Sequence, residues 1–292
     1  YRKVLTFTIN HDTAKDFDDA LSFVINKDKS FEVGIHIADV SHYVKPNSLL
    51  DKEAYERGTS VYLVDRVVPM LPEIISNGIC SLRPNEDKYT FSTVFTFNNE
   101  GILIKEWYGK TIINSDYRFS YNEVQHILET NSTLIKDEIS LTSNEYEIPK
   151  EVLKGLKKLN NVAKKLRKER MKEGAISFDR VEVKFQLDKK NDPKNVYFKK
   201  SREANKLVEE FMLLANKKVA SFISKKTNAS SVFRVHDKPD EEKLSNLKKT
   251  VEGLGYALKL NTKKTNVAIN KLLEECNGRK EKNLIDTLTL RS

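Results

Sequence analysis

Four aspartates crowd into eight residues near the start of the chain and constrain the fold more than any other feature. They are Asp12, Asp16, Asp18 and Asp19, with an apolar run on each side at residues 4–9 and 21–26. These flanks predict two β-strands, so the aspartates are expected in a loop at one end of a sheet. Carboxylates held this close raise one another's pKa unless a cation neutralises them.

The residue types in this cluster indicate which cation would bind. Oxygen ligands with little nitrogen or sulfur nearby favour Mg²⁺ or Mn²⁺. An EF-hand is excluded, because counting from Asp16 places Leu21 and Lys27 where that motif needs Gly and Glu. An exposed acidic turn without any ligand is the alternative, but the flanking strands bring the carboxylates close to the core.

The charge is divided unequally along the chain. Residues 1–149 contain 15 Lys and Arg against 23 Asp and Glu, whereas residues 150–292 contain 36 against 19. A basic half suggests a polyanionic partner, although solvated lysines on helices would give the same count. Carboxylates that hold Mg²⁺ beside a basic surface suit phosphodiester cleavage, with the basic part contacting the phosphates of a nucleic acid.

Hydrophobicity and cysteine content set the cellular class. No apolar run approaches the ~18 residues of a membrane span, and the N-terminus has no signal-peptide pattern. Two cysteines, Cys80 and Cys276, argue against a disulfide scaffold, and Cys80 is expected to be a buried thiol. The chain is therefore expected to be cytoplasmic and without a membrane partner. It is also expected to be monomeric.

Periodicity and turn residues predict an α/β (α+β) fold in one domain, with a mixed β-sheet flanked by helices. Ser48 and Gly58 bound one predicted helix, Ser120 and Glu123 form a capping box, and 98–101 is a hairpin turn. Further strands are expected at 31–37, 89–97, 101–113, 176–187, 196–198 and 231–235. Further helices are expected at 149–172, 201–225, 239–254, 265–276 and 282–290. A long irregular stretch is expected at 64–87, and the polar residues 130–148 are expected to form a linker or a surface insertion.

The acidic segment resembles a known signature. Residues 8–20 (TINHDTAKDFDDA) are similar to the T-I-D … D-F-D-D-A motif of the RNB catalytic domain, found in the ribonuclease II and ribonuclease R family. Further blocks follow in the family's order: 36–44 (HIADVSHYV), 57–62 (RGTSVY), 68–72 (VPMLP), 79–84 (ICSLRP), 205–216 (NKLVEEFMLLAN) and 233–236 (FRVH). The resemblance covers nearly the whole chain and is closer to ribonuclease R than to ribonuclease II.

The resemblance implies an RNB-type domain with an RNA channel. Its activity would be a Mg²⁺-dependent, processive 3′→5′ exoribonuclease that acts on the 3′ end of single-stranded RNA and releases 5′-nucleoside monophosphates. Asp18, Asp16 and Asp19 would be catalytic, and Asn10, Asp16, Asp18 and Asp19 would hold the metal. Asn10 departs from the family, which has Asp there, so a catalytically weakened or inactive RNA-binding fragment is the alternative. Asp12 is a further possible ligand that the family motif does not use.

Other matching positions would bind the substrate. Tyr62 would stack on the 3′-terminal base, Phe185 would oppose it, and Tyr121 would lie near the site. Glu209 or Glu210 would hold a ribose hydroxyl, which separates RNA from DNA. Ser201, Arg202 and Lys206 are candidates for phosphate contacts, although solvated helix charges explain them equally well.

The resemblance also bears on the extent of the domain. The family's later T-S-P-I-R-R-Y-type segment, with its catalytic arginine, does not occur in residues 1–292, so the chain is expected to be truncated at its C-terminus. The cold-shock and S1 domains that flank the family's catalytic domain are likewise expected to lie outside it. A Mg²⁺-dependent DNA nuclease is a further alternative, which the ordered blocks disfavour.

Overall fold

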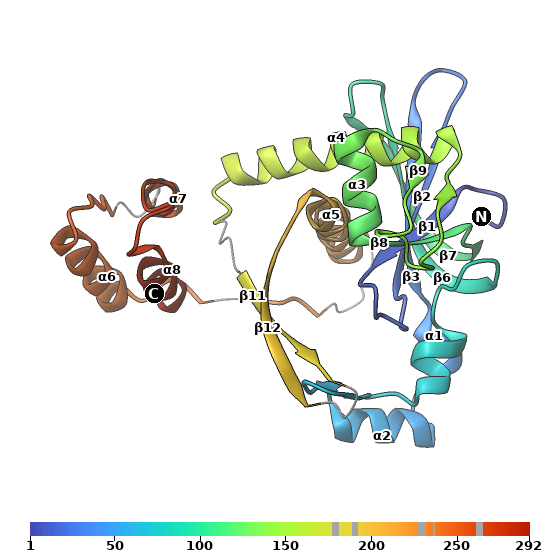
Figure 1. The fold of residues 1–292 in the computed structure, drawn as a ribbon, viewed down its shortest axis with the longest axis horizontal. Helices are drawn as coiled ribbons and strands as arrows, with labels where there is room; N and C mark the ends of the chain where they lie inside the picture. The colour runs from blue at the N-terminus through green and yellow to red at the C-terminus, as the bar shows by residue number, and fades with distance from the viewer. Residues whose placement is uncertain (177–180, 189–191, 227–231, 236, 261–264) are drawn as a thin grey trace. The chain divides into compact units, whose positions relative to one another are not determined.

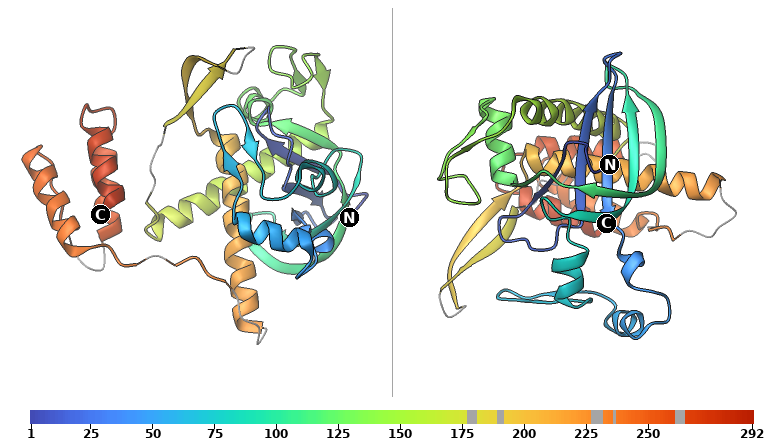
Figure 2. Two further views of the ribbon diagram at one scale, coloured as in Figure 1. Left: turned by 90° about the horizontal axis from the view of Figure 1, so that it is seen from below. Right: turned by 90° about the vertical axis from the view of Figure 1, so that its right-hand side faces the viewer.

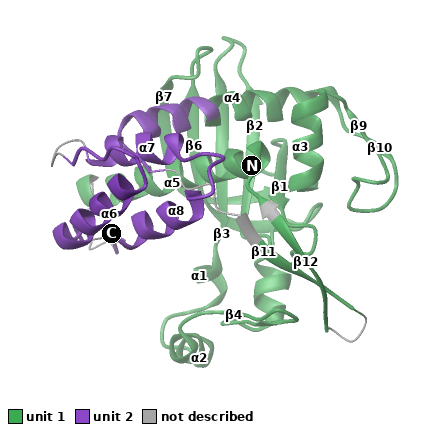
Figure 3. Ribbon diagram, turned by 60° about the vertical axis from the view of Figure 1, so that its left-hand side comes forward, with its two compact units in different colours: residues 1–163, 182–229 green, residues 164–181, 230–292 purple. Residues whose placement is uncertain are grey.

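The chain forms two compact units, each with its own buried core. The computed structural model describes residues 1–176, 181–188, 192–226, 232–235, 237–260 and 265–292. Unit 1 comprises residues 1–163 and 182–229, and unit 2 comprises residues 164–181 and 230–292 (Figure 3). The acidic cluster and every residue predicted to bind metal or substrate belong to unit 1.

Unit 1 is built on a six-stranded sheet in the order β7-β6-β3-β2-β1-β8 (Figure 1). The strands are β1 (Thr6–Asn10), β2 (Asp19–Ile25), β3 (Phe31–Ala38), β6 (Asp87–Phe97), β7 (Leu103–Asn114) and β8 (Tyr117–Ser120). Neighbours are antiparallel except β1 and β8, which are parallel. The sheet is therefore mixed and flanked by helices, which confirms the predicted fold class.

One face of the sheet forms the apolar core of unit 1. Because side chains alternate along a strand, the register puts Phe7, Leu21 and Ile35 on this face, and all three are at most 2% exposed. Two long helices, α4 (Lys150–Lys172) and α5 (Glu203–Lys226), supply the covering side. The backbone of α4 at Gly155 comes so close to Phe23 that a Cβ there would lie 3.1 Å from its ring.

The other face carries a buried polar network. His36 of β3 lies between the hydroxyls of Ser22 on β2 and Ser92 on β6, at 2.8 and 2.6 Å from its two ring nitrogens. The hydroxyl of Ser92 in turn bonds that of Thr111 on β7. Gly34 leaves the space for this arrangement, since a Cβ there would lie 2.3 Å from Ser22 Oγ. Four strands are thus joined by side chains as well as by the backbone.

Shorter elements lie outside the six-stranded sheet (Figure 2). They are α1 (Val40–Tyr43), α2 (Leu49–Arg57), the π-helix η1 (Ile74–Ile79), α3 (Tyr121–Thr130) and three hairpins. The hairpins pair β4 (Val61–Tyr62) with β5 (Val67–Val68), β9 (Leu134–Ile135) with β10 (Tyr146–Glu147), and β11 (Val181–Leu187) with β12 (Pro193–Lys200).

The local signals predicted several boundaries correctly. Ser48 caps α2, which ends at Gly58 in a left-handed conformation (φ +68°), and Ser120 and Glu123 form the capping box of α3. The stretch at 64–87, expected to be irregular, contains β5 and η1 instead. The strand expected at 231–235 is wrong for its described part: residues 232–235 are irregular and exposed, with no strand paired to them among the described residues. Ser231 lies outside the described residues.

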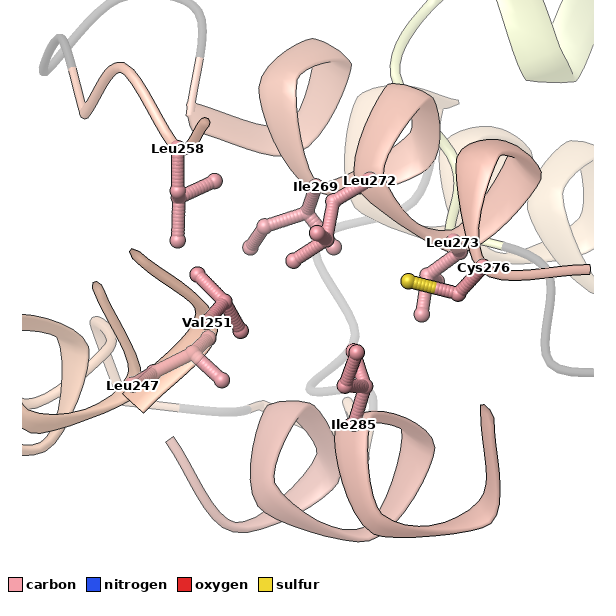
Figure 4. Packing of buried hydrophobic residues seen from close by; sticks show 8 residues of the cluster. All are labelled: Leu247, Val251, Leu258, Ile269, Leu272, Leu273, Cys276 and Ile285. Atoms are coloured by element: carbon pink, nitrogen blue, oxygen red, sulfur yellow. The ribbon is translucent and has the colours of Figure 1, made fainter. Parts of the chain in front are cut away.

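Unit 2 is helical and packs around a small hydrophobic core. Besides the last part of α4, residues 164–172, its helices are α6 (Glu241–Gly253), α7 (Thr265–Glu275) and α8 (Lys282–Arg291). Eight buried residues from these helices and the loops between them form the core shown in Figure 4: Leu247, Val251, Leu258, Ile269, Leu272, Leu273, Cys276 and Ile285. Apolar residues three or four positions apart on each helix supply this core, as the sequence periodicity predicted.

Candidate active site

One end of the sheet gathers segments that are distant in the sequence. β1 ends at Asn10, β2 begins at Asp19, and β8 ends at Ser120, which is paired with Asn10. Because β1 is antiparallel to β2 and parallel to β8, all three residues lie at the same end of the sheet. The acidic loop, residues 11–18, crosses this end between β1 and β2.

The acidic loop is fixed by the residue between two of its aspartates. Phe17 is buried, and its carbonyl accepts a hydrogen bond from Leu82 N at 2.9 Å. The carbonyl of Asp18 accepts one from Ala38 N, also at 2.9 Å. Asp16 is half-buried and Asp18 is exposed, whereas Phe17 between them is buried. Burial of one aromatic ring therefore presents the carboxylates.

Two polar side chains from outside the loop complete its support. The Ser81 hydroxyl donates to the carbonyl of Lys15 at 2.9 Å and accepts from Phe17 N at 3.0 Å. The Arg118 guanidinium of β8 lies 4.7 Å from the centre of the Phe17 ring and donates to the carbonyls of Asp12 and Ala14 at 2.8 and 3.1 Å. Neither Ser81 nor Arg118 was predicted from the sequence, because their partners are distant in the chain.

The carboxylates destabilise one another in the absence of a counter-ion. Burial, followed by the charge of Asp16, raises the pKa of Asp18. Burial, followed by the charge of Asp18, raises the pKa of Asp19 to about 6, although a backbone hydrogen bond works in the opposite direction. Burial is the larger cause of both pKa shifts, and the repulsion expected from the sequence is the smaller cause, which a bound cation would relieve.

The donor set fits a hard cation. Asn10 Oδ1 is buried and makes no hydrogen bond among the described residues, so a carbonyl oxygen is left available next to the acidic loop. Asp16, Asp18 and Asp19 add further oxygens. In the described part of the chain, however, no three His, Cys, Asp or Glu side chains already converge as a metal cage. Asp12 is exposed, and its carboxylate accepts from Asn122 Nδ2 at 3.3 Å.

Tyr121, a predicted substrate residue, lies next to the acidic loop, where it contacts His11. It is the first residue of α3, and its ring packs edge-on against His11 with 5.4 Å between centroids. Burial, and then the negative charge of Asp19, raise its pKa to about 12. The hydroxyl therefore stays protonated at neutral pH and can donate a hydrogen bond beside the carboxylates.

The other predicted substrate residues lie on separate elements. Tyr62 is 70% exposed on the β4–β5 hairpin, which Figure 3 shows beside α2. Phe185 is 44% exposed on β11. Glu209 and Glu210 are neighbours on α5, where Glu210 is buried and Glu209 is exposed. Successive helical residues point about 100° apart, so the two carboxylates face different surroundings.

A cavity of about 460 Å³ opens beside the acidic loop. His11 and Tyr121 line one part of it, and Tyr197, Phe198, Lys200 and Arg202 line another. Arg202 was a predicted phosphate contact, and Ser201 next to it is exposed. The aromatic pair on β12 was missed, although two adjacent aromatic residues followed by lysines were a visible signal.

The mixed sheet thus carries an acidic loop at one end, with Tyr121 and a cavity lined by aromatic and cationic residues beside it. The model of the RNB domain matches residues 1–292. The chain therefore belongs to the RNB family, as its sequence blocks predicted.

Individual relatives agree with this assignment. DIS3-like exonuclease 2 of Schizosaccharomyces pombe is 41% identical over 84% of this chain and 26% of its own length. Ribonuclease R of Thermotoga maritima is 37% identical over the whole chain and 39% of its own length. The solved RNase R of Mycoplasma genitalium, in complex with ribose-methylated single-stranded RNA, matches 99% of this chain and 43% of its own with a TM-score of 0.85 and 29% identity.

The relatives are longer than this chain. The chain spans about a quarter to two fifths of the length of the curated relatives that it matches. Similarity over that share establishes the family and the fold of this domain.

Proposed function

We propose that this chain is the catalytic domain of a processive 3′→5′ exoribonuclease that uses Mg²⁺, or Mn²⁺, to hydrolyse RNA to 5′-nucleoside monophosphates. The observation that carries the proposal is the acidic loop. Asp16, Asp18 and Asp19 lie together with raised pKa values for Asp18 and Asp19, beside the Asn10 oxygen, in a member of the RNB family.

The chemistry follows from the placement of these residues. When bound, Mg²⁺ would lower the pKa of a water molecule and neutralise charge on the scissile phosphate. Asp16, Asp18, Asp19 and Asn10 would hold the ion, and Asp18, the most exposed of the three carboxylates, would orient the attacking water. Tyr121 would donate its hydroxyl to a phosphate or ribose oxygen next to the cluster. Processive movement would return each new 3′ end to the same place.

RNA is the proposed substrate, held in a channel from its single-stranded 3′ end. The M. genitalium RNase R that shares this fold was solved with single-stranded and with double-stranded RNA. Within this chain, the excess of Lys and Arg after residue 149 supplies cations for phosphate contacts. Tyr62 and Phe185 offer exposed rings on which bases can stack, and Glu209 or Glu210 is proposed to bind the ribose 2′-hydroxyl.

We place this activity in the cytoplasm and in a monomer. Across the described residues, no helix is both long and apolar enough to span a bilayer. Cys80 and Cys276 are both buried free thiols, which suits a reducing compartment. Gel filtration with light scattering tests the monomeric state.

Asn10 supports a second candidate, an RNA-binding domain that keeps the site without its chemistry. An amide oxygen binds Mg²⁺ but brings no negative charge, so metal affinity and water activation are both expected to fall. The intact Asp16, Asp18 and Asp19 oppose this candidate. The two differ in whether any Mg²⁺-dependent cleavage can be measured.

The decisive experiment compares the chain with its Asn10→Asp variant on labelled RNA and on DNA of the same sequence, with Mg²⁺ and with EDTA. The proposal expects mononucleotides from RNA alone, abolished by EDTA, and a rise of at least tenfold in rate for Asn10→Asp. Asn10→Ser is the matched control and is expected to show no gain. Binding of RNA without cleavage by the parent, with cleavage gained in Asn10→Asp, would establish the second candidate, whereas no gain in Asn10→Asp would contradict the role of position 10. Equal cleavage of DNA would point to a nuclease of broader substrate range.

A further inference from the structure

The cavity beside the acidic loop has two walls of different origin. His11, from the loop after β1, and Tyr121, from the start of α3, form an edge-to-face pair on one side. Tyr197 and Phe198, successive residues of β12, also line it, and because side chains alternate along a strand their two rings project in opposite directions. All four residues belong to unit 1. Its volume of about 460 Å³ is within the range of pockets that hold a small organic ligand.

The aromatic residues of β12 are unusually exposed. Tyr197 is 53% exposed and Phe198 is 69% exposed. β12 belongs to a two-stranded hairpin, so neither residue is part of the six-stranded sheet. Large aromatic side chains left in water forgo the stabilisation that burial would give, and grouped exposure marks surfaces that bind partners.

Cations lie next to these rings. Lys200 is the last residue of β12, and Arg202 immediately precedes α5. Both side chains are exposed and line the cavity. Among the described residues that line the cavity, Asp12 is the only one with a carboxylate, and Asn122 contacts it at 3.3 Å. Aromatic faces combined with Lys and Arg match a single-stranded nucleotide, whose base stacks on a ring while its phosphate meets the cations.

The position of the cavity relates it to the proposed chemistry. Tyr121 lines the cavity, and the negative charge of Asp19 contributes, after burial, to the raised pKa of its hydroxyl. A nucleotide held there would therefore lie beside Tyr121 and next to the acidic loop, whose Asp12 also lines the cavity. The cavity is placed to hold a nucleotide adjacent to the scissile phosphate.

We propose that β12 presents one ring of the Tyr197–Phe198 pair to this cavity, beside His11 and Tyr121, as a stacking subsite for one nucleotide of the RNA strand, with its phosphate bound by Lys200 and Arg202. This inference rests on the proposed RNA substrate and adds a subsite to the positions Tyr62 and Phe185. Base stacking tolerates any base, so the subsite contributes affinity without sequence preference.

The test places 2-aminopurine at each position of a short single-stranded RNA in turn and measures quenching of its fluorescence on binding to the full chain in EDTA. We expect the double variant Tyr197→Ala/Phe198→Ala to lose quenching at one nucleotide position only, and to weaken RNA binding about 5- to 100-fold. Tyr197→Phe and Phe198→Trp should retain quenching. Tyr55→Ala, which removes a tyrosine that is 84% exposed on α2, is the matched control and should change nothing.

The cation part of the subsite has its own readout. Lys200→Ala should reduce the slope of log affinity against log salt by about one, whereas Lys52→Ala on α2 should leave it unchanged. Unchanged quenching at every position together with binding within twofold of the parent would overturn the subsite. Cleavage is measured separately, in the Asn10→Asp background. If the double variant loses quenching but Asn10→Asp does not cleave RNA, the proposed function fails and the subsite stands. If Asn10→Asp cleaves RNA and the double variant leaves its KM unaltered, the subsite fails and the proposed function stands.

Discussion

Ser81 and Phe17 are 64 residues apart in the sequence, and a hydrogen bond of 3.0 Å joins the Phe17 N–H to the Ser81 hydroxyl. The same hydroxyl donates to the carbonyl of Lys15 at 2.9 Å, so it holds the backbone on both sides of Asp16. Ser81 is fully buried and directly follows Cys80, which is also buried. Burial raises the pKa of the Cys80 thiol, so this segment supports the site and supplies no nucleophile.

These two hydrogen bonds of the Ser81 hydroxyl predict the effect of Ser81→Ala. The substitution leaves the buried Phe17 N–H without its acceptor, and such a loss costs about 1–3 kcal/mol. We expect Ser81→Ala to lower the Mg²⁺ affinity, because the acidic loop becomes less ordered; isothermal titration calorimetry in the Asn10→Asp background measures this. RNA binding in EDTA should stay within twofold of that of the parent. Ser81→Thr keeps the hydroxyl and should restore metal affinity. Ser76→Ala, on η1, is the control; equal losses in both alanine variants would refute a positioning role.

A second prediction concerns the pH dependence of stability without metal. The pKa of Asp19 rises from its ordinary 3.8 to about 6 on folding, mainly through burial and then through the charge of Asp18. The folded chain therefore holds a proton in this window that the unfolded chain releases, and the free energy of unfolding falls as the pH rises through it. The fall is on the order of 2–3 kcal/mol.

Urea unfolding in EDTA between pH 4 and 7 measures this effect. Asp19→Asn should lack the decrease and be more stable than the parent above pH 6, whereas Asp137→Asn, which changes an exposed aspartate, should behave like the parent. Mg²⁺ should stabilise the parent increasingly as the pH rises. A parent whose stability is flat across this range would contradict the buried charge of Asp19.

Gly34 provides a third prediction, about the polar face of the sheet. A Cβ at this position would lie 2.3 Å from Ser22 Oγ and 2.5 Å from His36 Nε2, closer than any side chain can approach. We expect Gly34→Ala to destabilise unit 1 by about 1–3 kcal/mol, because the network must shift or break. Gly78→Ala is the matched control, since its Cβ would meet only Glu73 O at 3.9 Å. Chemical denaturation followed by tryptophan fluorescence of Trp107 compares the two variants.

His36 supplies a fourth prediction, for acid. Burial lowers its pKa from 6.5 to about 3, so the folded chain keeps the imidazole neutral while the unfolded chain protonates it. Its contribution to stability is therefore present above pH 6.5 and is lost as the pH falls towards 3. Asp19 acts in the opposite direction over the upper part of this range, so each effect must be read from its own variant.

The measurement for His36 is the acid unfolding midpoint. His36→Gln removes the titrating group and should flatten the acid limb of the stability curve, at some loss of stability at neutral pH because the amide cannot reach both Ser22 and Ser92. His126→Gln, which changes a half-buried histidine on α3, should leave the acid limb as in the parent. An unchanged acid limb in His36→Gln would show that other groups control acid unfolding.

Much of the fold and the centre of the site were determined by the sequence itself. Alternating apolar residues predicted the main strands, the residues at Ser48, Gly58 and Ser120 predicted helix ends, and the spacing of Asp16, Asp18 and Asp19 predicted the acidic loop at a sheet end. These signals succeed because they depend on neighbours a few residues away, whose geometry the backbone sets.

Only the tertiary structure decided which distant residues support and surround that loop. Ser81, Arg118 and Tyr121 reach it because β1 pairs with both β2 and β8 and because η1 returns the chain beneath Phe17. The burial that raises the pKa of Asp19 likewise arises from packing and not from sequence spacing. Contacts between residues far apart in the chain depend on the register and packing of whole elements, which no local pattern encodes.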